Sequence, residues 1–65
     1  MQQFKVSGMS CGHCVRAISQ AIQALDPVAR VEVDLAAQLV RVESSLEAER
    51  IEAAIAEEGY EVAPA

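Results

Sequence analysis

The spacing of apolar residues most constrains the fold of this chain, because it changes between a period of two and helical steps. Residues 3–7 alternate polar and apolar side chains, as a half-buried strand does. Residues 12–25 then carry apolar side chains at steps of three and four, which predicts an amphipathic helix. Pro27 predicts the end of this helix, since the residue before a proline disfavours helical backbone angles. The repeated apolar residues of the helix are Val15, Ile18, Ile22 and Leu25.

The middle of the chain predicts a β-hairpin followed by a second helix. Residues 30–35 and 39–43 both alternate and are joined by a short connection, so we expect an antiparallel pair, although the connection lacks an Asn-Gly turn. Ser44 and Glu47 have the spacing of a capping box, which places the start of the next helix at Ser44. The apolar stripe of that helix consists of Ile51, Ala54 and Ile55.

The last residues complete a β-α-β-β-α-β order. Gly59 stands where a left-handed residue ends a helix, residues 60–62 predict a short strand, and residues 63–65 predict a frayed end. This order predicts an α+β fold of the ferredoxin-like, split-βαβ kind, a four-stranded antiparallel sheet with two helices on one face. We expect residues 1–65 to form a single domain.

Composition excludes several classes of function. Ten acidic residues against five basic ones give a net charge of −5, which argues against a nucleic-acid partner. The chain holds no apolar run near the ~20 residues that span a bilayer, so we expect no membrane insertion. Residues 1–6 lack the apolar stretch of a secretory signal. We therefore expect a cytoplasmic protein, in which a pair of cysteines is reduced.

Both cysteines lie within residues 9–14, Met-Ser-Cys-Gly-His-Cys, between a predicted strand and a predicted helix. Soft thiolates select metals such as Cu(I) and Zn(II). Two ligands cannot close a four-coordinate structural zinc site, but they suit a metal that accepts low coordination and is handed on. Cys14 falls in the first helical turn, where the positive end of the helix dipole favours a thiolate. We predict Cys11 and Cys14 as metal ligands of a protein that is not an enzyme.

Residues 8–14, Gly-Met-Ser-Cys-Gly-His-Cys, resemble the G-M-[ST]-C-x-x-C loop of heavy-metal-associated domains. The resemblance covers essentially the whole chain and is greatest to the small bacterial copper chaperones of that family. It implies Cu(I) as the cargo, bound by Cys11 and Cys14 and passed by ligand exchange to a copper-exporting P-type ATPase. The other partners that we expect are a copper-responsive regulator and a second copy of the chain, bridged by copper.

Three residues that we expect near the thiols each allow more than one role. The family resemblance implies that Met9 packs inward beneath the loop, although its thioether could serve as a third ligand. His13 could tune the cysteines through its charge, could be an inert exposed side chain, or could ligate the metal. Tyr60 could shield the thiolates or simply cap the core.

Other functions remain open at this point. The chain could be the detached metal-binding domain of a P-type ATPase, or it could bind mercury or zinc. A periplasmic mercury carrier would need a signal sequence, and a zinc site would want a nearby carboxylate. A dithiol oxidoreductase usually has an aromatic residue before its first cysteine and a cis-proline opposite. Here Ser10 precedes Cys11, and Pro27 and Pro64 are poorly placed.

Overall fold

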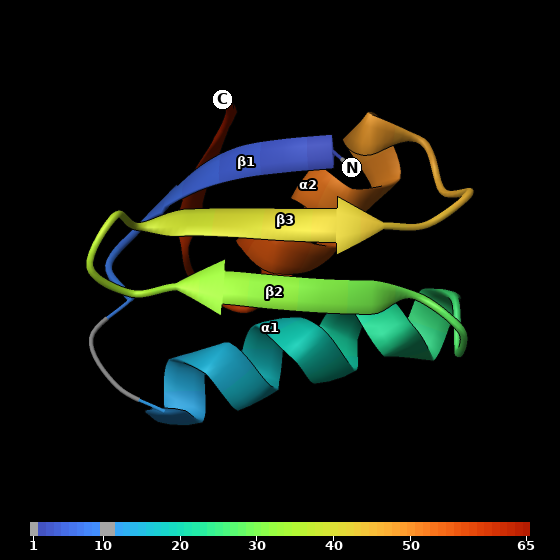
Figure 1. Ribbon diagram of the computed structural model, residues 1–65, viewed down its shortest axis with the longest axis horizontal. Coiled ribbons are helices and arrows are strands. Elements are labelled where there is room, and N and C mark those ends of the chain that lie inside the picture. The colour runs from blue at the N-terminus through green and yellow to red at the C-terminus, as the bar shows by residue number, and fades with distance from the viewer. Residues whose placement is uncertain (1, 10–11) are drawn as a thin grey trace.

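A computed structural model describes residues 2–9 and 12–65. The four strands form one antiparallel sheet in the order β2-β3-β1-β4, so β1 lies in the interior of the sheet. Both helices lie against the same face of the sheet (Figure 1), which confirms the predicted fold class. The elements in chain order are β1 (Gln2–Ser7), α1 (Gly12–Leu25), β2 (Arg30–Asp34), β3 (Leu39–Glu43), α2 (Ala48–Glu57) and β4 (Glu61–Pro64).

A single apolar layer between the sheet and the helices forms the core. Strand alternation turns every second side chain toward the helices, and the helical stripes face back toward the sheet. The largest fully buried side chains are Phe4, Val6, Ile18, Ile22, Val40, Val42, Ile51 and Ile55. Within the described residues, neither helix has the length and apolar character that crossing a membrane requires.

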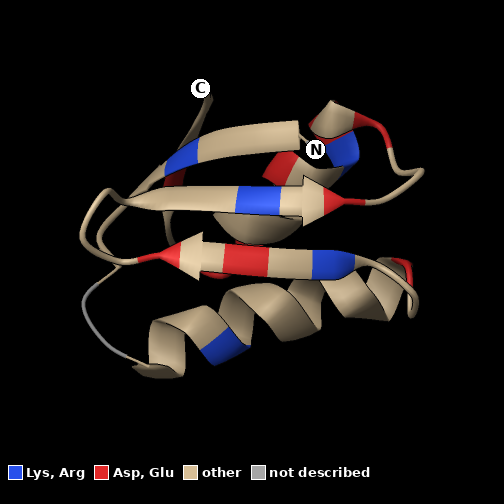
Figure 2. Ribbon diagram, in the orientation of Figure 1, with Lys and Arg blue, Asp and Glu red and all other residues tan. Residues whose placement is uncertain are grey.

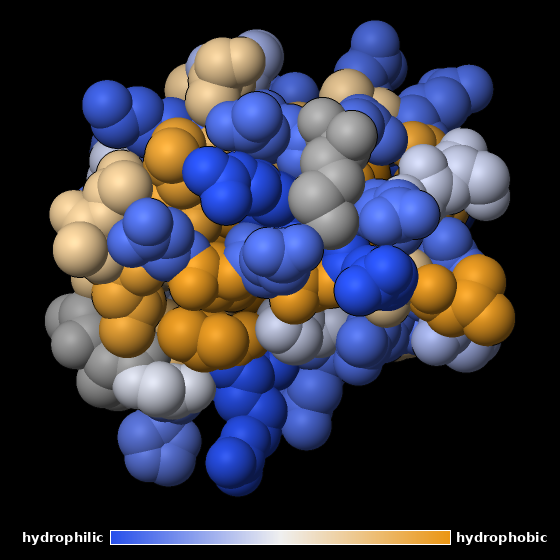
Figure 3. Space-filling model, viewed as in Figure 1, coloured by the Kyte–Doolittle hydropathy of each residue, from blue (hydrophilic) through white to orange (hydrophobic). Residues whose placement is uncertain are grey.

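The other face of the sheet carries charged side chains in complementary pairs. Glu32 on β2 lies opposite Arg41 on β3, and Arg30 lies opposite Glu43 with 3.9 Å between their charged groups. Figure 2 shows acidic and basic residues along these two strands, and Figure 3 shows a hydrophilic surface with some apolar side chains between the polar ones. Opposite charges in register stabilise neighbouring strands, and their polar groups suit a solvent-exposed face.

The predicted capping box at the start of α2 is wrong. The helix begins at Ala48 with Glu47 at its N-cap, and the Glu47 side chain makes no capping hydrogen bond to the described residues. The Ser44 hydroxyl instead donates to Asp26 Oδ2 at 2.6 Å and accepts from the Leu46 amide at 3.1 Å. The Ser44 hydroxyl therefore bonds to Asp26, which is distant in sequence, and does not cap the helix as the local pattern predicted.

The predicted frayed end is also wrong. β4 continues through Pro64, which pairs with Phe4, and the Ala65 amide donates to the Gln3 carbonyl at 3.2 Å. Proline has no amide hydrogen, yet it is tolerated here because β4 is an edge strand with a free side. The strand begins at Glu61, one residue later than expected.

Candidate metal centre

Cys14 lies in the first turn of α1 and anchors the candidate site to the core. It is partly buried and packs against the core cluster. Cys14, Ile18 and Ile22 are spaced by four residues and therefore share one side of the helix. Val15, which was expected on this buried stripe, is partly exposed and instead lines a hollow beside β2. Steps of three and four fit either residue, and only the packing of the helix decides between them.

The other predicted ligand, Cys11, lies outside the described residues, as does Ser10. Across residues 2–9 and 12–65, no three His, Cys, Asp or Glu side chains form a group that could hold a metal ion. Of the two predicted ligands, Cys14 is therefore the one that the structure describes, in the first turn of α1.

The start of α1 favours a thiolate at Cys14. Unpaired amides at a helix N-terminus carry partial positive charge, which stabilises a negative sulfur nearby. Throughout α1, every residue of which is described, the sequence places no acidic residue in the first turn to oppose that effect. His13 is exposed beside Cys14, and adjacent helical residues point about 100° apart. Its role stays a prediction.

Met9 is buried, as expected. Its side chain is 5% exposed and belongs to the core cluster, where the flexible thioether fills space beneath the end of β1. Gly8 precedes it with φ of 92°, a backbone conformation that other residues rarely adopt. The chain thus leaves β1 through a sharp turn and is held by the buried Met9 before it reaches the cysteines.

Tyr60 follows α2 and lies beside this turn. It is partly buried, packs against the core, and its Cδ1 would lie 3.8 Å from a Cβ built on Gly8. The expected neighbourhood of Tyr60 and the residues before Cys11 is therefore confirmed, and so is contact with the core. The shielding of the thiolates by its ring stays a prediction.

One residue at this end of the molecule, Gln38, was not predicted from the sequence. Its side-chain Nε2 donates to the Met9 carbonyl at 2.9 Å from the connection between β2 and β3. The available signal was the absence of glycine and asparagine from residues 35–38. The connection contains one left-handed residue, and with no glycine or asparagine available that position is taken by Gln38.

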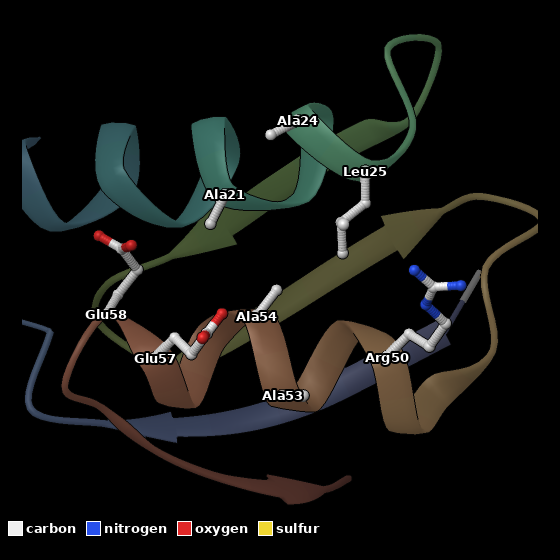
Figure 4. Close-up of a pocket in the computed structure, with 8 residues that line it drawn as sticks. All are labelled: Ala21, Ala24, Leu25, Arg50, Ala53, Ala54, Glu57 and Glu58. Carbon is white, nitrogen blue, oxygen red and sulfur yellow. The ribbon is translucent and has the colours of Figure 1, made fainter.

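A groove on the helical side is separate from this site. It holds about 420 Å³ between α1 and α2 and is lined by Ala21, Ala24, Leu25, Arg50, Ala53, Ala54, Glu57 and Glu58. Figure 4 shows Arg50 and Leu25 toward one end and the two glutamates toward the other. Leu25, expected in the buried stripe, is 43% exposed here. The groove is lined by neither cysteine nor histidine and offers nothing to a soft metal.

Comparison with known proteins matches the chain to one domain family and to copper proteins. The sequence profile described as "Heavy-metal-associated domain" matches residues 3–61. The chain is 44% identical over 61 residues to copper chaperone CopZ of Staphylococcus epidermidis, covering 89% of this chain and 90% of that protein. It is 36% identical over 64 residues to copper-transporting ATPase 1 of Rhizobium meliloti, covering 95% of this chain and 8% of the ATPase. Copper chaperone Atx1 from Synechocystis PCC6803 (Cu2 form) superimposes with a TM-score of 0.93 at 36% identity, covering 97% of this chain and 100% of that one.

Proposed function

This chain belongs to the heavy-metal-associated domain family, and from that premise we propose that residues 1–65 form one domain that carries Cu(I) on Cys11 and Cys14. The protein acts in the cytoplasm as a copper chaperone and catalyses no reaction. It delivers its cargo to a copper-exporting P-type ATPase and exchanges copper with a copper-responsive regulator. When copper is in excess, two copies share the metal through their thiolates.

The position of Cys14 carries this proposal. Its partial burial on the stripe of Ile18 and Ile22 fixes one sulfur to the core, while the helix N-terminus stabilises that sulfur as a thiolate. Cu(I) is soft and accepts few ligands, so two thiolates suffice to hold it. The relatives named as copper chaperones support copper over zinc or mercury as the cargo.

Transfer proceeds by exchange of thiolates. An incoming thiolate of the acceptor forms a copper–sulfur bond, and one of the bonds to Cys11 or Cys14 then breaks, so the metal keeps its charge and is never released to water. Both proteins hold the metal in the intermediate. The net charge of −5 favours approach to a basic surface of the acceptor.

Anaerobic titration with Cu(I) against a competing chelator tests the proposal. We expect one copper per monomer in the wild type and loss of tight binding in the Cys11→Ser, Cys14→Ser double variant, with the far-UV circular dichroism unchanged. Met9→Leu is the matched control, because its buried thioether serves packing and its loss should leave the stoichiometry at one. Tight binding that survives in the double variant contradicts the proposal.

A second candidate is that these residues are the metal-binding domain of a P-type ATPase. The match to the Rhizobium meliloti ATPase over 64 residues favours it, since the same domain occurs there within a much longer chain. The mass of the native protein, detected with an antibody against this domain, separates the two. A band near 6.9 kDa supports the chaperone, and a much larger band supports the ATPase domain.

A further inference from the structure

Gln38 holds a backbone conformation that its side chain makes unfavourable. Its φ is 57°, and among residues 2–9 and 12–65 it is the one residue other than glycine with a positive φ. In this left-handed region the Cβ of an L-residue crowds the backbone, so glycine or asparagine is usual. A glutamine is retained in such a place only when its surroundings hold it there.

Four hydrogen bonds hold Gln38 in this conformation. Its backbone amide donates to the Leu35 carbonyl at 3.4 Å, and its carbonyl accepts from the Val6 amide at 2.9 Å. Its side-chain Nε2 donates to the Leu35 carbonyl at 2.7 Å and to the Met9 carbonyl at 2.9 Å. Both side-chain acceptors are carbonyl oxygens, so only the NH₂ end of the amide can face them, and its two hydrogens are both engaged.

These bonds join two segments that are far apart in sequence. Figure 1 shows the β2–β3 connection on the same side of the molecule as the start of α1. Met9 is held twice, by its side chain in the core and by its carbonyl on Gln38. The bond to that carbonyl restrains the backbone of Met9, which is the last described residue before the cysteines.

We propose that Gln38 is a positioning residue for the metal-binding segment, residues 9–14, acting through the Met9 carbonyl. By restraining Met9, where this segment begins, it lowers the conformational entropy that metal binding must remove, and so it strengthens copper binding and slows release. The metal-binding part of this proposal rests on the proposed function, and the coupling of Gln38 to Met9 does not.

Two substitutions separate positioning from folding. Gln38→Met has a similar size but no donor, and its matched control is Gln2→Met. The Gln2 side chain also donates to a main-chain carbonyl, that of Leu46 at 2.9 Å, at the opposite end of the sheet. Gln38→Gly removes the same donor while suiting the positive φ, so relief of the backbone strain offsets part of the stability lost with the two side-chain hydrogen bonds.

The measurements are ¹⁵N relaxation of Gly8, Met9 and Gly12 in the metal-free proteins, and Cu(I) affinity and release rate. Both Gln38 variants should show increased motion at these amides. Copper affinity should weaken about 10-fold, at the lower end of the loss found when a residue that orients a metal ligand is removed, because Gln38 acts through Met9 and not on a ligand itself. Gln2→Met should match the wild type in both. The key comparison is Gln38→Gly, in which a purely structural role would leave copper affinity at the wild-type value.

Each outcome decides the proposal. Wild-type relaxation in both Gln38 variants overturns the coupling, and increased motion with wild-type copper affinity and release overturns its effect on the metal. If the wild-type protein itself binds no Cu(I), the proposed function fails, while the relaxation data still decide whether Gln38 restrains Gly8, Met9 and Gly12.

Discussion

The two ends of the sheet are closed in different ways. At the opposite end, away from the start of α1, side chains tie successive connections together. Asp26 accepts from the Ser44 hydroxyl at 2.6 Å and the Val28 amide at 3.3 Å, while Leu46 donates to Ser44 and accepts from Gln2. These bonds join the segments before β2, before α2 and at the start of β1, so we expect this end of the sheet to serve the stability of the fold.

The thiol end, which comprises Gly8, Met9, Cys14, Gln38 and Tyr60, has two side chains close to the point where the chain leaves β1. The Gln38 side-chain amide donates to the Met9 carbonyl, and Tyr60 Cδ1 lies 3.8 Å from the position that a Cβ on Gly8 would take. Gly8 and Met9 both precede the predicted ligand Cys11 in the chain. We therefore expect that substitutions can change the stability of the fold and the proposed metal binding separately, provided that they avoid the shared core.

The largest effect on stability should come from a substitution in the core, which both ends of the sheet share. Ile22 is fully buried in the core, and Ile22→Ala should lower the free energy of unfolding by about 2–5 kcal/mol, through lost burial and the cavity left behind. Urea denaturation measures it, with Val28→Ala, at an 84% exposed site, as the control. An effect below that of the control would mean that Ile22 is not part of a close-packed core.

A smaller effect is expected at the turn of the thiol end. Gly8→Ala places a side chain at φ of 92°, where the backbone penalty is about 1–2 kcal/mol, although the new Cβ would meet only Tyr60 at an ordinary contact distance. Gly12→Ala is the matched control, since it lies in α1 with open space around the site, and it should be neutral or stabilising by up to ~1 kcal/mol. Equal losses in urea denaturation would contradict a requirement for glycine at position 8.

At the opposite end, Ser44→Ala should lower stability by about 1 kcal/mol, because Asp26 and the Leu46 amide both lose a partner. Copper affinity should remain at the wild-type value. Ser45→Ala changes an exposed neighbour and controls for the substitution itself. A shift in copper affinity with Ser44→Ala would show that the two ends are coupled after all.

The smallest effect is expected on the open face of the sheet. Arg30 and Glu43 are 75% and 58% exposed, and their groups approach only to 3.9 Å. Arg30→Gln should therefore change stability by less than about 0.5 kcal/mol, and added salt should remove the difference. A loss above 1 kcal/mol in low salt would show that the charge pairs of this face act as a network.

Local patterns predicted most of the fold from the sequence. The bounds of α1 and β3 follow from apolar spacing and from Pro27, which act within a few residues. Ser44 and Pro64 were misjudged because their partners, Asp26 and Phe4, are distant in sequence. Such pairings form only when the sheet and helices have packed.

The candidate site could be predicted in part for the same reason. Two cysteines before a helix are visible in the sequence, and the inward packing of Met9 was expected and is confirmed. The choice of Cys14 over Val15 for the buried stripe depends on how α1 is rotated against the sheet, which spacing leaves open. Gln38 carries no local signal for its bond to Met9, since that bond spans 29 residues of chain.

Because β1 and β4 run antiparallel, the two chain ends come out together at the opposite end of the sheet, where the Ala65 amide meets the Gln3 carbonyl. A reporter, a tether or a neighbouring domain fused at residue 2 or residue 65 would therefore leave the thiol end unobstructed. The same adjacency suits circular permutation, since a short peptide could join the present ends without passing near Cys14.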